Sequence, residues 1–131
     1  MLSPRMHEEF LLGVHRWMLQ RIQGPTIMHI CGDITPRLDA LQHTGLTCFN
    51  FDWAIEPAVM KRAADGHFRI MGNVNTTDLM RGTPADITRQ VIRNLEAGVD
   101  IISPGCAISP TCPNVNLRAM IETITRWHGL S

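Results

Sequence analysis

Two side chains that favour soft metals lie two residues apart in the first part of the chain, and a third lies far downstream. His29 and Cys31 end the run Thr-Ile-Met-His-Ile-Cys, and Cys106 follows a Pro-Gly pair. On a β-strand, residues two apart point to the same face, so this imidazole and this thiol would project side by side. An imidazole and two thiolates suit zinc, and three protein ligands with one open position are typical of a catalytic zinc. The pattern predicts a zinc site at these three residues, with a buried histidine and structural cysteines as the alternative.

Other polar side chains follow the ends of the later apolar runs. Asp52 ends the second run, Glu56 comes just after it, and Asn73 and Asn75 end the third. Asp52 is a catalytic candidate, as an acceptor for the metal-bound imidazole or as a displaceable fourth ligand, but a carboxylate that caps the next helix fits equally. Glu56 competes for the same role. Asn73 and Asn75 are candidates for binding a cofactor or orienting a substrate, with turn formation as the alternative.

The remaining cysteines and histidines are expected to be structural. Cys48 lies inside a strand pattern, which favours a buried thiol. Cys112 is expected in a loop facing solvent, and not as an extra zinc ligand. The other histidines are expected at the surface: His7, His15, His43, His67 and His128.

The elements that must position these side chains alternate between strand and helix. Four short apolar runs predict strands over residues 26–31, 47–52, 68–74 and 99–103, the first of them buried. Strands that alternate with helices predict a parallel sheet, either open and doubly wound or part of a (β/α)8 barrel. No Gly-x-Gly-x-x-Gly motif follows a strand, so a dinucleotide-binding fold has no support. A complete barrel takes about 250 residues, so this chain of 131 residues would form a single domain and, in the barrel alternative, a partial barrel of about half that size.

Capping residues and prolines mark the helices. Thr83 is a side-chain cap and Asp86 sits where a capping box places an acid, which predicts a helix over residues 84–97. Gly98 closes it. The other helices are expected to begin at Ser3-Pro4, at Thr35-Pro36 and near Asn114.

Two of these helices carry apolar residues at helical spacing, which we expect to form buried faces. In the first helix this face consists of Phe10, Leu11, Val14, Trp17 and Met18. In the last helix it consists of Leu117, Met120, Ile121, Ile124 and Trp127.

The composition restricts the partners. Apolar residues make up 44% of the chain, charged residues 18%, and the net charge is zero. Without a basic excess to neutralise phosphates, nucleic-acid binding is not expected. No apolar stretch approaches the ~20 residues that cross a bilayer, and the first residues lack the pattern of a signal peptide. We therefore expect a cytoplasmic protein with reduced thiols, whose partner is a small molecule or another protein.

Four short motifs occur in the order found in one enzyme superfamily. They are His-Ile-Cys-Gly-Asp from His29, Asn-Phe-Asp-Trp from Asn50, Met-Gly-Asn-Val-Asn from Met71 and Pro-Gly-Cys from Pro104. In this order they resemble the C-terminal half of the uroporphyrinogen decarboxylase superfamily, equivalent to strands 5–8 of a (β/α)8 barrel. The His-x-Cys pair and the distant Pro-Gly-Cys resemble the branch of methylcobalamin:coenzyme M methyltransferases.

The resemblance implies an α/β fold with four parallel strands and helices outside, and a zinc ion held by His29, Cys31 and Cys106. It also implies a methyltransferase. A small thiol such as coenzyme M, activated by zinc, would accept the methyl group of a methylcobalamin corrinoid carried by a separate protein. The alternatives are a tetrapyrrole enzyme similar to the decarboxylases, and a non-catalytic half-barrel that serves as an interaction module.

A half-barrel leaves unpaired edges at its first and last strands, which invite association. Its inner face, lined by Ile27, Phe49, Ile70 and Ile101 or by their alternating neighbours, would lack an opposite wall. Exposed apolar surface of this kind marks an interface. We therefore expect the chain to pair with a missing N-terminal half-barrel or with a second copy, and to be inactive alone.

Overall fold

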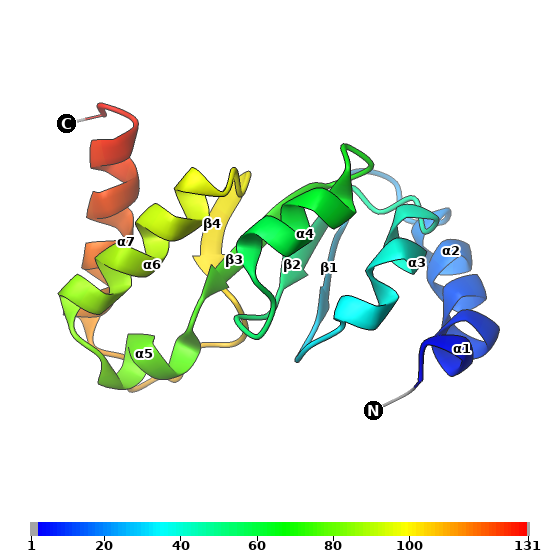
Figure 1. The fold of residues 1–131 in the computed structure, drawn as a ribbon, viewed down its shortest axis with the longest axis horizontal. Helices are drawn as coiled ribbons and strands as arrows, with labels where there is room; N and C mark the ends of the chain where they lie inside the picture. Colours follow the sequence, from blue (N-terminus) through cyan, green and yellow to red (C-terminus); the bar gives the residue numbers. More distant parts are fainter. Residues whose placement is uncertain (1–2, 131) are drawn as a thin grey trace.

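Four strands form one parallel sheet in the computed structural model, which describes residues 3–130 (Figure 1). They are β1 (Ile27–Ile30), β2 (Cys48–Phe51), β3 (Arg69–Val74) and β4 (Ile101–Pro104). Each strand pairs with the next one along the chain, in the order β1-β2-β3-β4. The predicted parallel sheet is confirmed, and each strand overlaps its predicted range.

Helices connect the strands and cover one side of the sheet (Figure 1). The first helical segment consists of α1 (Pro4–His7), a π-helical stretch η1 (Glu8–Leu12) and α2 (Gly13–Leu19). The later ones are a 3-10 turn η2 (Thr35–Arg37), α3 (Leu38–Gln42), α4 (Pro57–Ala64), α5 (Thr76–Arg81), α6 (Pro84–Glu96) and α7 (Asn114–Trp127). Among the described residues, no helix combines the length and the apolar character that a membrane span requires.

Local capping explains where two of these helices begin. The Thr83 hydroxyl accepts a hydrogen bond from the Asp86 N–H, and the Asp86 carboxylate accepts one from the Thr83 N–H at 2.8 Å, so the predicted capping box of α6 is confirmed. Helix α5 was not predicted, because its six residues are too few to show an apolar period. Its N-cap is Asn75, whose side-chain oxygen accepts a hydrogen bond from the Thr77 N–H at 2.8 Å.

The buried core lies between the helices and one face of the sheet. Phe49, Phe51 and Ile70 are fully buried there, packed with apolar side chains of α3 and α4. The opposite face is open. On it, Ile27 is 62% exposed and Ile101 is 45% exposed. The expectation of a buried first strand was therefore wrong, because β1 is an edge strand with one uncovered face.

Two alternating sets of strand residues were candidates for the inner face of the half-barrel, and the open face carries residues from each set. The strand register pairs Asn50 with Met71 and Met71 with Ile101, so these three side chains share a face. Phe49 pairs with Ile70 on the helix-covered face instead. Alternation within a strand shows which of its residues share a face, but the relative phase of neighbouring strands comes from their pairing.

Two predicted helix faces are more exposed than expected. In the first helical segment, Phe10, Val14, Trp17 and Met18 are exposed, and in α7 so are Ile121 and Trp127. The other three predicted residues of α7, Leu117, Met120 and Ile124, do pack against a buried cluster that includes Ile87 and Val91. No other part of residues 3–130 covers these exposed side chains, so the apolar period did not predict burial at these positions.

His7 is not the surface residue that the sequence analysis predicted. It is 1% exposed, and its ring lies against that of His15, with 5.6 Å between the ring centroids. Neither ring nitrogen of His7 has a hydrogen-bond partner among the described residues. A buried imidazole without an acceptor favours its neutral form, because the charged form would lose its hydration.

Acid is expected to destabilise the fold through His7. Burial lowers its pKa below the ordinary 6.5, the nearby charges of His15 and Arg37 lower it further, and Glu8 opposes them. Below pH 6.5 the unfolded chain therefore binds a proton that the folded chain refuses until a lower pH, and the free energy of unfolding falls. Denaturant titrations of the metal-free protein on either side of this pH measure the effect.

A matched pair of variants tests whether His7 causes this fall in the free energy of unfolding at acid pH. His15 is half-buried instead of exposed as predicted, and burial lowers its pKa too. His7→Leu removes one of these two imidazoles and should weaken the loss of stability at acid pH without abolishing it, whereas His128→Leu changes an exposed residue and should leave that loss as in the parent protein. An unchanged loss of stability in His7→Leu would show that another group is responsible.

Candidate metal centre

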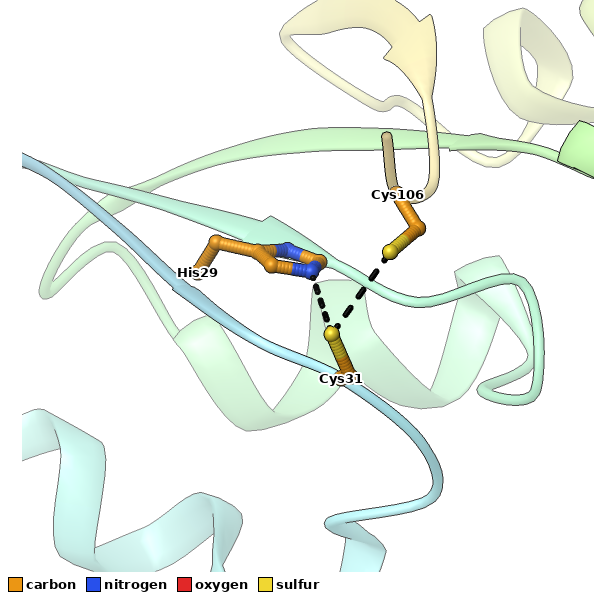
Figure 2. Close-up of side chains that lie close together, drawn as sticks. All are labelled: His29, Cys31 and Cys106. Atoms are coloured by element: carbon orange, nitrogen blue, oxygen red, sulfur yellow. Dashed lines mark hydrogen bonds between the residues drawn. The ribbon is translucent and has the colours of Figure 1, made fainter. Parts of the chain in front are cut away.

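The two separate parts of the predicted ligand set, the pair His29 and Cys31 and the distant Cys106, lie together at the carboxyl ends of the strands. His29 lies on β1, Cys31 follows the end of that strand, and Cys106 lies in the loop after β4 (Figure 2). The Nε2 atom of His29 is 3.2 Å from the Sγ atom of Cys31, which is 3.5 Å from the Sγ atom of Cys106. All three ligand atoms lie within 4.8 Å of one another. Residues from the two opposite edges of the sheet thus form one cluster.

The spacing of these atoms fits a tetrahedral metal. With zinc bonds of about 2.0–2.3 Å, neighbouring ligand atoms lie about 3.3–3.8 Å apart. The distances from the Cys31 sulfur to its two neighbours fall in or next to this range. His29 and Cys31 are exposed, which leaves room for a further ligand from outside the chain. The donor set of one imidazole and two thiols is one that zinc prefers.

The tautomer of His29 is fixed by the neighbouring strand. Its Nδ1 atom is 2.9 Å from the main-chain oxygen of Asn50, and a carbonyl can only accept, so Nδ1 carries the hydrogen. The lone pair is then on Nε2, the nitrogen that faces Cys31. Ligand histidines are typically oriented by a hydrogen bond of this kind at the other ring nitrogen.

Without a metal, the cluster holds Cys31 in its thiol form. The hydrogen bond with Cys106 raises the pKa of Cys31 above its ordinary value, and desolvation and the negative charges of Cys106 and Asp52 raise it further. At neutral pH the metal-free thiol is therefore protonated. A metal that binds here must displace that proton.

A glycine lets the loop after β4 pass close over the other strands. Gly105 donates its N–H to the Val74 oxygen at 2.9 Å, and a Cβ atom placed on it would lie 2.7 Å from the main-chain nitrogen of Trp53. Any larger residue would push the loop away from the sheet. In the sequence, Gly105 stands out only as part of the Pro-Gly-Cys motif. Its position immediately before a candidate ligand was the available signal.

Asp52 lies beside the cluster and binds main-chain groups. It is buried, and its carboxylate accepts hydrogen bonds from the N–H groups of Gly32 at 2.8 Å and Ala54 at 2.9 Å. The hydrogen bond that orients the His29 imidazole comes from Asn50 instead. Asp52 thereby connects the segment that follows Cys31 to the loop after β2.

The three other candidates lie apart from the ligand atoms. Glu56 is half exposed and pairs with Arg93 of α6. Asn73 is buried, and its amide nitrogen donates to the main-chain oxygens of Ile55 at 2.7 Å and Asp52 at 3.3 Å. Asn73 and Asn75 line a separate polar pocket of about 180 Å³, together with Trp53, Asp78, Gln90, Arg93 and Asn94.

The two remaining cysteines are not members of the cluster. Cys48 is buried, as the strand pattern predicted, and burial raises the pKa of its thiol. Cys112 is half-buried and its thiol lies 3.2 Å from the Leu79 oxygen, against the buried cluster beneath α7. It is therefore less exposed than the loop thiol that the sequence analysis expected.

A shallow concavity of about 400 Å³ adjoins the ligands on the open face of the sheet. Its wall is mostly apolar and includes two of the proposed ligands, His29 and Cys106, and the polar side chains of Asn50 and Ser103. Its lining residues are Ile27, His29, Asn50, Met71, Ser103, Pro104, Cys106, Ala107 and Ile108. A small molecule bound to a metal at the cluster would extend into this space.

Known proteins similar to this chain include two characterised methyltransferases. A methylated-thiol–coenzyme M methyltransferase from Methanosarcina mazei is 31% identical over 123 residues, which cover 93% of this chain and 33% of that protein. Methylcobamide:CoM methyltransferase MtbA from Methanosarcina acetivorans is 33% identical over 128 residues, which cover 93% of this chain and 37% of that protein. The chain thus spans about a third of the length of these relatives.

A solved structure gives the same result for the fold. A methyltransferase from Methanosarcina mazei superimposes with a TM-score of 0.93 at 25% identity, over 98% of this chain and 39% of that one. The predicted partial barrel of four parallel strands with outer helices is confirmed by this match. Residues 1–127 match the family described as Uroporphyrinogen decarboxylase (URO-D). This chain belongs to the uroporphyrinogen decarboxylase family.

Proposed function

We propose that this chain is the zinc-binding part of a cytoplasmic methyltransferase that moves a methyl group from a corrinoid protein to a thiol such as coenzyme M. The observation that carries the proposal is the convergence of His29, Cys31 and Cys106, whose ligand atoms lie within 4.8 Å of one another. The relatives named for methylcobamide and coenzyme M support the choice of substrates.

In this proposal the side chains have three separate roles: binding the metal, positioning its ligands and contacting the substrate. His29, Cys31 and Cys106 would hold zinc, which keeps a substrate thiol deprotonated near neutral pH when bound. Asn50 keeps the Nε2 lone pair of His29 directed at the cluster, and Asp52 fixes the segment after Cys31. The apolar concavity would contact the carbon atoms of the thiol.

The direct test measures metal and activity on the same preparation. We expect about one zinc per chain in tetrahedral geometry, measured by elemental analysis and X-ray absorption, with sulfur and nitrogen neighbours. Protein without zinc that decarboxylates a porphyrinogen would favour the tetrapyrrole chemistry for which the family is named. Zinc bound without any thiol alkylation, even with the rest of the barrel supplied, would favour an interaction module.

The polar residues away from the cluster have positioning roles in this proposal. Glu56 fixes α4 to α6 through Arg93, and Asn73 and Asn75 hold the loop after β2 and the start of α5. None of these contacts reaches the ligand atoms, so we assign them to the shape of the rim and not to the reaction.

The open face of the sheet is proposed to pack against a complementary half-barrel. It exposes Ile27 and Ile101, and the matched relatives have further chain beyond the part that aligns with this one. We expect the isolated chain to self-associate in light scattering and to bind zinc without measurable methyl transfer. A stable monomer that demethylates methylcobalamin would overturn this part of the proposal.

Zinc binding is expected to release protons, because cysteines bind metals as thiolates. Cys31 has a raised pKa in the metal-free protein, so this residue alone should release about one proton for each zinc bound near neutral pH. The affinity must then rise with pH and fall on acidification. Calorimetry in buffers of different ionisation enthalpy measures the release, and a value near zero would point to oxygen ligands.

A further inference from the structure

We propose that Asn50 positions the two distant parts of the metal centre relative to each other. It lies in the middle of β2, between the strand that carries His29 and the strand that leads to Cys106. Its main-chain oxygen contacts His29, and its side chain contacts Ser103 and Pro104, just before Cys106. This inference rests on the proposed function for its consequence, and on the contacts of Asn50 for its geometry.

The main chain of Asn50 acts on β1. In the register of the parallel pair, His29 is the partner of Asn50, and the Asn50 oxygen accepts a hydrogen bond from the Nδ1–H of the imidazole at 2.9 Å. Any residue would supply this oxygen. It is the side chain that makes asparagine specific at this position.

The side chain of Asn50 reaches across β3 to the end of β4. Its amide nitrogen lies 2.9 Å from the Ser103 hydroxyl oxygen and 3.3 Å from the main-chain oxygens of Pro104 and Met71. The Ser103 hydroxyl in turn donates to the Pro104 oxygen at 3.0 Å. All the neighbours of the amide therefore present acceptors, and Cys106 follows two residues after this anchor. An amide has two N–H groups that can donate to these acceptors, whereas a carboxylate or an apolar side chain has none.

Without the amide, the loop after β4 should lose its register over the sheet and the Cys106 sulfur should leave its place beside Cys31. Outer partners of metal ligands are worth about ten- to a hundredfold in metal affinity. We expect a loss of this size for zinc in Asn50→Leu, which keeps the volume and the neutrality of the residue and removes both donors.

The number of sulfur atoms on the metal distinguishes positioning from general damage. In the Co²⁺ form, sulfur-to-cobalt charge-transfer absorption grows with the number of bound thiolates, so loss of Cys106 alone should reduce it to about half. Asn116→Leu is the matched control. Asn116 is also buried, and its amide bridges the Leu79 and Gly82 oxygens without contacting the cluster residues or Asn50. It should lower stability without changing the spectrum.

A second measurement works without any metal. Diamide oxidises Cys31 and Cys106 to a disulfide: the two thiols give up two protons and two electrons, and the azo bond of diamide takes them up to become a hydrazine. The starting sulfur–sulfur distance of 3.5 Å should make this reaction fast in the metal-free parent protein. We expect Asn50→Leu to slow it about tenfold or more, and Ser103→Ala, which removes one of the three acceptors, to slow it less.

These outcomes separate the two proposals. Slower disulfide formation in Asn50→Leu, with no metal bound by the parent protein, would support the role of Asn50 and overturn the zinc function. Unchanged disulfide formation and an unchanged Co²⁺ spectrum in Asn50→Leu would overturn the role of Asn50 and leave the zinc function standing. If Asn50→Leu does not fold, the rate in Ser103→Ala decides, and a rate equal to that of the parent protein counts against the inference.

Discussion

Replacing Cys106 with alanine is expected to abolish tight zinc binding. Zinc sites in proteins have apparent binding free energies of about 10–16 kcal/mol, so one ligand among three or four accounts for roughly 3–4 kcal/mol, or two to three powers of ten in affinity. Cys106 also joins the two edges of the sheet through its contact with Cys31. Competition with a chromophoric chelator measures the zinc affinity of the variant against that of the parent protein.

Cys48→Ala is the matched control, because it removes a thiol that is buried and lies outside the cluster. We expect it to cost about 1 kcal/mol in unfolding free energy and to leave zinc binding intact. Equal loss of zinc in both variants would mean that the fold, and not Cys106, determines binding. Full retention in Cys106→Ala would remove that residue from the ligand set.

The second large effect is expected from Gly105→Ala, which adds one methyl group. The added Cβ would lie 2.7 Å from the Trp53 nitrogen and 3.3 Å from the carbonyl carbon of Asp52. Both are main-chain atoms, so the loop must move instead, at a cost of about 1–3 kcal/mol in stability. The movement takes Cys106 with it, and zinc affinity should fall about ten- to a hundredfold.

Gly13→Ala tests whether the substitution type alone is responsible. A Cβ at Gly13 meets no heavy atom within 4 Å, and the residue has a helical φ of −62°. Alanine there should leave zinc affinity unchanged and should stabilise the helix by up to about 1 kcal/mol. Wild-type zinc affinity in Gly105→Ala would show that the loop tolerates the methyl group and that its close approach does not place the ligand.

The proximity of the three proposed ligands could be predicted because local spacing and strand ends both restrict where their side chains lie. His29 and Cys31 are two apart on an extended segment, which makes them neighbours in any sheet. Cys106 could be added because the ends of parallel strands meet at one edge of the sheet. The structure does bring all three together.

The residues that hold the ligands in place could not be predicted in the same way. Asn50 acts through partners on β3 and β4, and Gly105 through the main chain of Trp53. Both depend on contacts between segments that are far apart in the chain. A polar residue inside an apolar strand and a glycine before a ligand are signals of such contacts, but neither identifies the partner.

Burial was less predictable than secondary structure for a related reason. The apolar period of the first helical segment was identified correctly, but Trp17 and Met18 are exposed because burial requires a second surface. His7 shows the opposite case. Its polar side chain suggested the surface, yet it packs against His15 inside the protein, where the sequence offered no period to indicate it.

The cluster brings together residues 75 positions apart in the chain, at opposite edges of one sheet. A metal bound there would act as a cross-link that closes a long loop, which removes conformational entropy from the unfolded chain in the way that a disulfide does. It would also fix the curvature of the sheet, because the ends of β1 and β4 could no longer separate. Under the proposed function the ion would then have two roles, activation of the thiol and restraint of the two sheet edges, so removal of zinc would lower the stability of the fold as well as the activity.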